Sequence, residues 1–330
     1  NALTLEMIRS IKDQLHHWKQ NEKVALVFLH GEGEKAFCAG GDVKNLYSLI
    51  LKAREEKTDP GLAVEPFFRE EYEMDYLLHT YPKPVVVWGQ GVVMGGGMGL
   101  FQAGSHSIVT DTSLLAMPEI SIGLFPDVGG SWFLSRLPGK LGWYLALTGC
   151  RLNSAEVMFL GWSQFYFKNQ EKGEVFKSLL SIDFQNGEDL THRLQNLQTS
   201  SPSSENWLEK YKELASQVVQ SGDAKTIYTE LTKSSAEDKK WNKNKETFLK
   251  GSPTSAGIIC EQLKQGKNKN LKEVFQMELI MALQCARHPD FAEGVRALLV
   301  EKTGQPVWQP KDIGLLEEAW IQGHFTASSS

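Results

Sequence analysis

Two stretches of this 330-residue chain share one order of features, and that order limits the folds that are open to it. Each has a run of apolar, strand-forming residues, then a glycine-rich turn, then residues that can start a helix; they span 24–43 and 84–100. Glycines allow backbone conformations and close approaches that a side chain would block. Strands that alternate with helices in this way predict an α/β sheet covered by helices.

Neither glycine-rich turn matches a common nucleotide-binding motif. No Gly-x-Gly-x-x-Gly is followed by an acid on the next strand, and the chain has no Gly-x-x-x-x-Gly-Lys-Ser/Thr sequence. A strand–turn–helix junction leaves backbone N–H groups at a helix N-terminus, where they stabilise negative charge. Two such turns favour an oxyanion hole made of two N–H donors. The alternative is that each is an ordinary tight turn.

A third stretch, 117–130, carries two acids in an otherwise apolar setting. Glu119 and Asp127 lie eight residues apart, after a short apolar run at 113–117 that predicts a buried strand ending at Pro118. A lone carboxylate in apolar surroundings is costly or has a shifted pKa, so a pair of them indicates acid/base or nucleophilic chemistry. Alternatively, one acid caps a helix that begins near Val128 and the other is solvated.

Together these segments resemble the crotonase superfamily of enoyl-CoA hydratases and isomerases, and within it the 3-hydroxyisobutyryl-CoA hydrolases. The resemblance is strongest over 35–151, weaker over 168–250, and recovers at 291–308. It rests on four segments in this order: AFCAGGDV, GVVMGGGMGL, MPEISIGLFPDVGG and DFAEGVRALLVEK.

The resemblance implies a spiral of repeated ββα units followed by a helical C-terminal region. We therefore expect a spiral core over 1–165 and a helix-rich region over 166–330 that covers the active site. The family normally has a strand pair before the position at which this sequence begins, so we expect N-terminal strands to be missing from it.

The resemblance also implies roles for individual residues. Gly41 and Gly96 match the oxyanion-hole residues, which donate backbone N–H groups to the thioester oxygen. Glu119 matches the catalytic acid. Asp127 matches a position that is usually glycine in simple hydratases and a carboxylate in the hydrolases, and Glu71 matches a substrate-contacting position. The implied substrate-binding set is Glu71, Gly96, Glu119 and Asp127, and the implied catalytic pair is Glu119 and Asp127.

One departure from the hydratases bears on the reaction. They carry a second catalytic glutamate three residues after the middle glycine of the second turn, where this chain has Gly99. The expected function is therefore hydrolysis of a short 3-hydroxyacyl-CoA thioester, namely 3-hydroxyisobutyryl-CoA in valine breakdown. The alternatives are an enoyl-CoA hydratase or isomerase, and a non-catalytic member that binds acyl-CoA or RNA.

The chemistry leaves further alternatives open. Glu119 could attack the thioester to form a mixed anhydride, or it could deprotonate the attacking water. Asp127 could orient the substrate's 3-hydroxyl or serve as a second base. Two close carboxylates repel each other, so we expect their titrations to be coupled and the pKa of one of them to be raised.

The composition indicates which classes of binding partner to expect. The chain has 35 basic and 40 acidic residues, a net charge of −5, and no basic block, so nucleic-acid binding is not indicated. No apolar run reaches the roughly 18 residues of a membrane span. The four cysteines are scattered without metal-site spacing, which indicates reduced thiols in an intracellular protein. We expect no metal and no cofactor beyond the CoA of the substrate.

The expected partner is the acyl-CoA substrate, and a homo-oligomer is left open. The expected location is the mitochondrial matrix in a eukaryote or the cytoplasm in a bacterium.

Local patterns predict the individual elements. Thr4 is the expected N-cap of a helix over 4–20, because apolar residues follow at helical spacing. We expect strands at 24–30, 84–88, 107–110 and 114–117, and helices from 43 to about 52, 65–80, 271–285 and 291–302. The charged stretch 52–61 predicts a surface loop. Surface helices are expected over 180–250.

Overall fold

The computed structural model describes residues 1–184 and 189–327. The chain forms two compact units, each assembled from three stretches. The sheet unit comprises Asn1–Gly40, Met74–Ala116 and Arg151–Lys210, and the helical unit comprises Gly41–Glu73, Met117–Cys150 and Tyr211–Ser330. The predicted boundary between 165 and 166 follows chain order, and these interleaved units do not test it.

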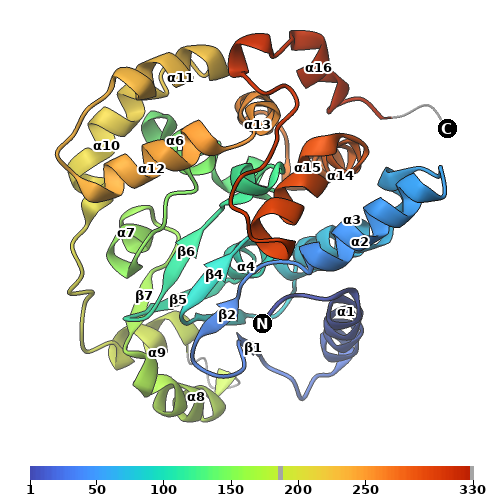
Figure 1. Cartoon of the computed structure of the whole chain (residues 1–330). Helices are drawn as coiled ribbons and strands as arrows, with labels where there is room; N and C mark the ends of the chain where they lie inside the picture. The colour runs from blue at the N-terminus through green and yellow to red at the C-terminus, as the bar shows by residue number, and fades with distance from the viewer. Residues whose placement is uncertain (185–188, 328–330) are drawn as a thin grey trace. The chain divides into compact units, whose positions relative to one another are not determined.

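The strands of the sheet unit form two sheets, and every strand pair in them is parallel. The strand order is β1-β3-β5-β7 in one sheet and β2-β4-β6 in the other, so the chain passes alternately between them (Figure 1). This alternation confirms the predicted α/β spiral. The strands are β1 (Val27–His30), β2 (Ala36–Cys38), β3 (Val85–Gly89), β4 (Val92–Met94), β5 (His106–Thr110), β6 (Leu114–Ala116) and β7 (Phe165–Phe167).

Continuous apolar sequence explains the centre of the four-stranded sheet. All five residues of β3 are buried, as expected for a parallel strand that is covered on both faces. Side chains from α8 (Lys172–Leu180) and α9 (Leu190–Leu197) pack against β3, β5 and β7 in one apolar cluster. The cluster contains Val86, Trp88, Ile108, Phe165, Phe167, Val175, Leu179, Leu190 and Leu194.

The remaining helices have the following bounds. The sheet unit also contains α1 (Leu5–Gln20), α4 (Gly96–Gln102), η3 (Asn169–Glu171) and α7 (Ser154–Phe159). Two helices, α3 (Pro60–His79) and α10 (Trp207–Val218), begin in one unit and end in the other. The helical unit contains α2 (Val43–Glu55), η1 (Glu119–Ile122), α5 (Gly130–Phe133), η2 (Pro138–Lys140), α6 (Leu141–Thr148), α11 (Ala224–Lys233), α12 (Lys239–Lys250), α13 (Pro253–Gly266), α14 (Leu271–Arg287), α15 (Pro289–Val295), the π-helix η5 (Arg296–Val300), η6 (Ile313–Leu315) and α16 (Glu318–Gly323).

Several predicted elements are confirmed and others are corrected. Thr4 caps α1, since its hydroxyl accepts a hydrogen bond from the backbone N–H of Met7 at 3.2 Å. The strand predicted at 24–30 begins only at Val27, and the glycine-rich turn expected after it is preceded by the short strand β2. The helix predicted at 291–302 begins earlier, at Pro289, and changes to a π-helix at Arg296.

The predicted surface loop at 52–61 is wrong in its extent. Helix α2 continues to Glu55 and α3 begins at Pro60, which leaves only four residues between them. Proline favours the first position of a helix, because a backbone N–H at that position would have no acceptor within the helix and its loss costs nothing. Asp59 holds this turn, accepting a hydrogen bond from Gly61 at 2.8 Å and pairing with Arg287 at 2.7 Å.

The helices predicted between 180 and 250 are present, but they are not only surface elements. Trp241 of α12 is fully buried, and its ring stacks on Tyr144 of α6 at 5.4 Å. No helix in the described part of the chain is both long enough and apolar enough to cross a membrane.

Within the helical unit, glycines bring α15 into backbone contact with η1. A Cβ atom on Gly123, whose φ is +70°, would lie 2.3 Å from the carbonyl oxygen of Asp290. A Cβ atom on Gly294 would lie 2.4 Å from the carbonyl carbon of Ile122. The helix can therefore lie this close to the turn only because both positions lack a side chain.

We predict that Gly123→Ala lowers the free energy of unfolding by at least about 2 kcal/mol, because it combines a left-handed backbone with a steric clash. Urea denaturation measures this loss. Gly173→Ala in α8 is the control, since a Cβ atom there meets open space; it should stabilise by about 0.5–1 kcal/mol. Equal effects of the two substitutions would contradict this packing.

Candidate active site

The turn that carries the acids begins where β6 ends. Pro118 follows the strand and stands at the N-terminus of η1, so Glu119 is the first residue of a tight turn. The N–H of Leu124 donates to the carbonyl of Glu119 at 3.1 Å, which closes the turn. The N–H of Ser252 donates to the carbonyl of Ile120 at 3.1 Å and ties the turn to the start of α13. A residue at the start of α13 thus holds the backbone of this turn in place.

The Glu119 carboxyl group is buried, with only 4 % of the residue exposed. Within the described residues its Oε2 atom has no hydrogen-bond partner. Burial raises the pKa of Glu119 well above its ordinary value, and the negative charge of Asp127 raises it further. The predicted rise of one pKa is therefore present at Glu119, and the pKa of Asp127 is raised as well. A buried carboxyl group with an unused oxygen is suited to proton transfer or nucleophilic attack.

The Asp127 carboxyl group is equally buried, at 5 % exposure, and is held by Tyr72 of α3. The Tyr72 hydroxyl donates a hydrogen bond to Asp127 Oδ2 at 2.8 Å. Burial raises the pKa of Asp127 to about 6, although the hydrogen bond from Tyr72 acts to lower it. Burial and nearby carboxylates raise the pKa of Tyr72 well above its ordinary value, so its hydroxyl stays a donor.

The structure does not support the alternative in which Asp127 is a helix cap. The N-cap residue of helix α5 is Gly129, which has no side chain that could cap the helix. Instead, Glu278 of α14 accepts the N–H of Gly129 and the N–H of Ser131, both at 2.8 Å. The Asp127 side chain is therefore not needed to cap α5.

Glu71 and Gly41 also lie in the helical unit. Glu71 is a buried residue of α3, next to Tyr72. Gly41 directly precedes Asp42, whose side chain caps α2 by accepting the N–H of Asn45 at 3.2 Å. A Cβ atom on Gly41 would lie 2.8 Å from the Phe67 ring and 3.9 Å from Glu71 Oε1. The helical unit therefore brings Gly41 and Glu71 together.

Gly96 belongs to the sheet unit, unlike the other four predicted site residues. It is the first residue of α4 and follows Gly95, whose φ is +52°. A Cβ atom on the next residue, Gly97, would lie 2.3 Å from the carbonyl oxygen of Cys38, so α4 approaches β2 closely. The first N–H groups of a helix have no acceptor within it, which suits Gly96 as a donor. Its pairing with Gly41 in an oxyanion hole stays a prediction.

Sequence reasoning missed Tyr72, Glu278 and Gln262, which all contact the turn 126–131 or Asp127 itself. The sequence around Glu278 contains a pattern from which its role could have been predicted. Glu278 lies four residues after Val274, on the apolar face of the helix predicted at 271–285. A charged residue on such a face is unusual unless it has partners. Tyr72 carried no such signal, because an aromatic residue is ordinary on a buried helix face.

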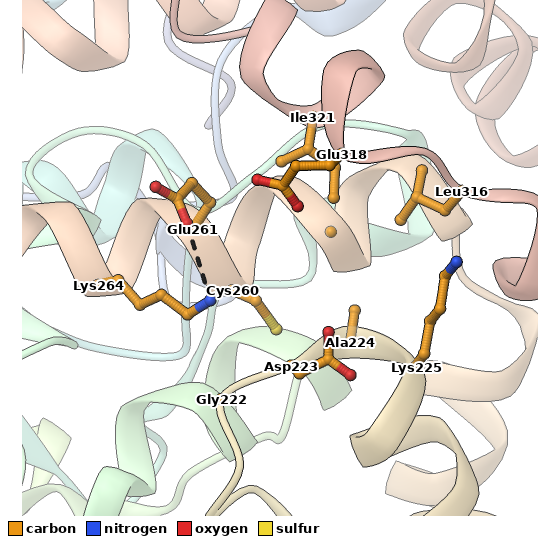
Figure 2. A pocket seen from close by; sticks show the side chains of 11 residues that line it. Gly222, Asp223, Ala224, Lys225, Cys260, Glu261, Lys264, Leu316, Glu318 and Ile321 are labelled. Atoms are coloured by element: carbon orange, nitrogen blue, oxygen red, sulfur yellow. Dashed lines mark ion pairs between the residues drawn. The ribbon is translucent and has the colours of Figure 1, made fainter.

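A separate hollow of about 200 Å³ lies in the helical unit, between α11, α13 and the C-terminal segment (Figure 2). Its charged side chains include Asp223, Lys225, Glu261, Lys264 and Glu318. Lys264 pairs with Glu261 at 3.8 Å, and the Lys225 amine donates to the carbonyl of Gly314 at 3.2 Å. None of the predicted site residues lines this hollow, so we do not assign the reaction to it. No group of three or more His, Cys, Asp or Glu among the described residues could hold a metal ion.

We predict that the buried acids make stability fall as the pH rises above neutrality. Burial raises the pKa of Glu278 to about 8, and those of Asp127 and Asp290 to about 6. A group that binds its proton more tightly when folded stabilises the fold below its unfolded pKa and loses that contribution as the pH passes its folded pKa. Four histidines whose pKa burial lowers act in the opposite direction below about pH 6.5; they are His79, His106, His288 and His324.

The decline should therefore be clearest between pH 6.5 and 8.5, and each such acid contributes at most about 1.4 kcal/mol per pH unit to the slope. Urea denaturation at several pH values measures it. Glu278→Gln should flatten the slope, whereas Glu213→Gln, at an exposed position on α10, should leave it unchanged. A wild-type stability that stays level or rises over this range would contradict the assignment.

Comparison with known proteins places these features in a family. Residues 1–325 match the family model described as enoyl-CoA hydratase/isomerase. The 3-hydroxyisobutyryl-CoA hydrolase, mitochondrial, of Danio rerio is 36% identical over 330 residues, covering 99% of this chain and 84% of that protein. The protein of the same name from Homo sapiens is 36% identical over 334 residues, covering 100% of this chain and 84% of its own length.

Two solved structures resemble the whole chain. One is an enoyl-CoA hydratase from Rhodobacter sphaeroides 2.4.1, with a TM-score of 0.86, 27% identity, and coverage of 99% of this chain and 91% of that one. The other is a carnitinyl-CoA dehydratase from Mycobacterium thermoresistibile, with a TM-score of 0.87, 28% identity, and coverage of 99% and 90%. The alternating parallel sheets, the acid-bearing turn and these matches together show that the chain belongs to the enoyl-CoA hydratase/isomerase family.

Proposed function

We propose that this chain hydrolyses the thioester bond of 3-hydroxyisobutyryl-CoA, releasing 3-hydroxyisobutyrate and CoA as a step of valine breakdown. The observation that carries the proposal is the buried pair Glu119 and Asp127, each with a raised pKa, within one short segment of the helical unit. The curated relatives that are 36% identical over nearly the whole chain are named for this hydrolysis.

Glu119 is the residue that acts on the reacting carbonyl. In one route its carboxylate attacks the carbonyl carbon, the C–S bond breaks, and water then hydrolyses the mixed anhydride to restore the carboxylate. In the other route it takes a proton from the water that attacks the carbonyl, and the CoA thiolate leaves. Both routes consume one water and give one acid and one thiol. The oxygen Oε2, which has no partner among the described residues, is available for either step.

Asp127 orients the substrate's 3-hydroxyl in this proposal. Tyr72 binds one oxygen of the Asp127 carboxyl group and so restricts its rotation. A site that binds a hydroxyl through a fixed polar group discriminates strongly against the analogue that lacks it, because the polar group is then left unpaired. The alternative, in which Asp127 is a second base for water, predicts no such discrimination.

The remaining site assignments follow the family resemblance. Glu71 contacts the substrate, and Gly41 and Gly96 donate N–H groups to the thioester oxygen. One oxyanion donor is worth about 2.7–4 kcal/mol of barrier in well-studied hydrolases. The proposal needs no cofactor beyond the CoA of the substrate. The relatives' names include the word mitochondrial, which supports a location in the mitochondrial matrix for a eukaryotic source.

Hydration of an enoyl-CoA is the second candidate function, because one of the similar solved structures is titled an enoyl-CoA hydratase. The residue at the position of the second hydratase glutamate is Gly99, a buried residue inside α4. Without a side chain it cannot transfer a proton during addition of water to a double bond. Hydrolysis, which requires one carboxylate at the carbonyl, is therefore favoured.

We predict that Glu119→Gln lowers kcat for 3-hydroxyisobutyryl-CoA at least about 100-fold, the usual loss when a general acid/base is removed. KM should change much less, because the amide occupies nearly the same volume. Release of free thiol measures both constants. Glu213→Gln, an exposed change of the same kind, is the control and should keep normal turnover. If Glu119→Gln kept near-normal turnover, the catalytic assignment would be wrong.

A further inference from the structure

The backbone directly after Asp127 has an unusual conformation. Val128 has a φ of +50°, and Gly129, which follows it, has a φ of +88°. A β-branched residue such as valine rarely adopts the left-handed region, because its side chain crowds the backbone there. Such a conformation persists only where surrounding groups hold it in place. The turn 126–131 therefore requires external contacts to keep its shape.

Glu278 supplies two of those contacts from α14. It is fully buried, and its two carboxyl oxygens are divided between two donors. Oε2 accepts the N–H of Gly129 and Oε1 accepts the N–H of Ser131, each at 2.8 Å. These N–H groups belong to the start of α5, where a helix has no acceptors of its own. One side chain thus binds the backbone just after Val128.

Gln262 of α13 holds the same turn at its two ends. Its amide nitrogen Nε2 donates to the carbonyl oxygen of Pro126 and to the hydroxyl of Ser131, the latter at 2.9 Å. The turn is therefore bound on both sides of Asp127, by α13 before it and by α13 and α14 after it. Tyr72 binds the carboxyl group itself.

We propose that Glu278 is a positioning residue for the reaction, which holds the turn 126–131 in the one backbone conformation that presents Asp127 to the 3-hydroxyl of the substrate. The inference rests on the proposed function, since it needs Asp127 to contact that hydroxyl. A carboxyl group is costly to bury on an apolar helix face, and an apolar side chain would fill the space more favourably. What an apolar side chain could not do is accept the two N–H groups.

The first test is Glu278→Gln. The amide keeps one acceptor oxygen but places an NH₂ group against the second N–H, so one contact to the turn is lost. We expect kcat for 3-hydroxyisobutyryl-CoA to fall about tenfold and kcat for isobutyryl-CoA, which lacks only the hydroxyl, to fall by about twofold at most. A residue that is merely structural would lower both alike, and equal losses would overturn the proposal.

The second test is a double-mutant cycle with Asp127→Asn. If Glu278 acts through Asp127, the double variant should turn over 3-hydroxyisobutyryl-CoA no more slowly than Asp127→Asn alone. If the two losses multiply, Glu278 acts independently and the proposal is wrong. Glu278→Asp, which keeps the carboxyl group but is one methylene shorter, is a second and milder variant for the same cycle. Glu213→Gln is the matched control, and a melting curve of each variant confirms that it is folded at the assay temperature.

The outcomes separate this inference from the proposed function. Absence of thiol release from 3-hydroxyisobutyryl-CoA by the wild-type protein would overturn the proposed function. Selective loss on the hydroxyl ester in Asp127→Asn, together with multiplying losses in the cycle, would overturn only the role of Glu278. Selective loss in both single variants, with no further loss in the double variant, would support both.

Discussion

The site depends above all on the burial of two carboxyl groups, Glu119 and Asp127, within the segment 117–130. Glu119 and Asp127 lose most of their hydration, and this raises the pKa of each. Groups that are costly to bury remain in place only where the surrounding structure determines their position. Here α15 lies against η1 through two glycines, and α13 and α14 hydrogen-bond to the turn 126–131. The C-terminal helices therefore hold the acids in place.

The side chains at a few positions bear on which reaction a shared fold can support. In the proposed function the Glu119 carboxyl group serves hydrolysis, and the side chains around the substrate decide between hydrolysis and addition of water. In this chain α4 contributes glycine rather than a carboxylate at Gly99, and the turn contributes Asp127 with its hydrogen bond from Tyr72. The fold is shared with a solved enoyl-CoA hydratase and a solved carnitinyl-CoA dehydratase, whereas the side chains of this chain favour the proposed thioester hydrolysis.

Local patterns in the sequence predicted the features that depend on neighbouring residues. The buried run of β3, the cap at Thr4 and the acid-bearing turn all have signals within a few positions. The pKa rise of Glu119 also followed from its apolar setting. Strand β2 was missed because three residues carry too little pattern, and the short turn before Pro60 was missed because charged residues also suit a helix end. Tyr72 lies 55 positions from Asp127 in the chain and Glu278 lies 149 positions from Gly129, and only the fold brings them into contact.

In the proposed function this chain breaks a thioester bond rather than adding water to a double bond. The most direct measurement supplies the purified protein with 3-hydroxyisobutyryl-CoA and with crotonyl-CoA, and follows free thiol from the first and loss of the conjugated double bond from the second. We expect rapid thiol release from 3-hydroxyisobutyryl-CoA and little or no hydration of crotonyl-CoA. A hydration rate comparable to the rate of thiol release would contradict the proposed function.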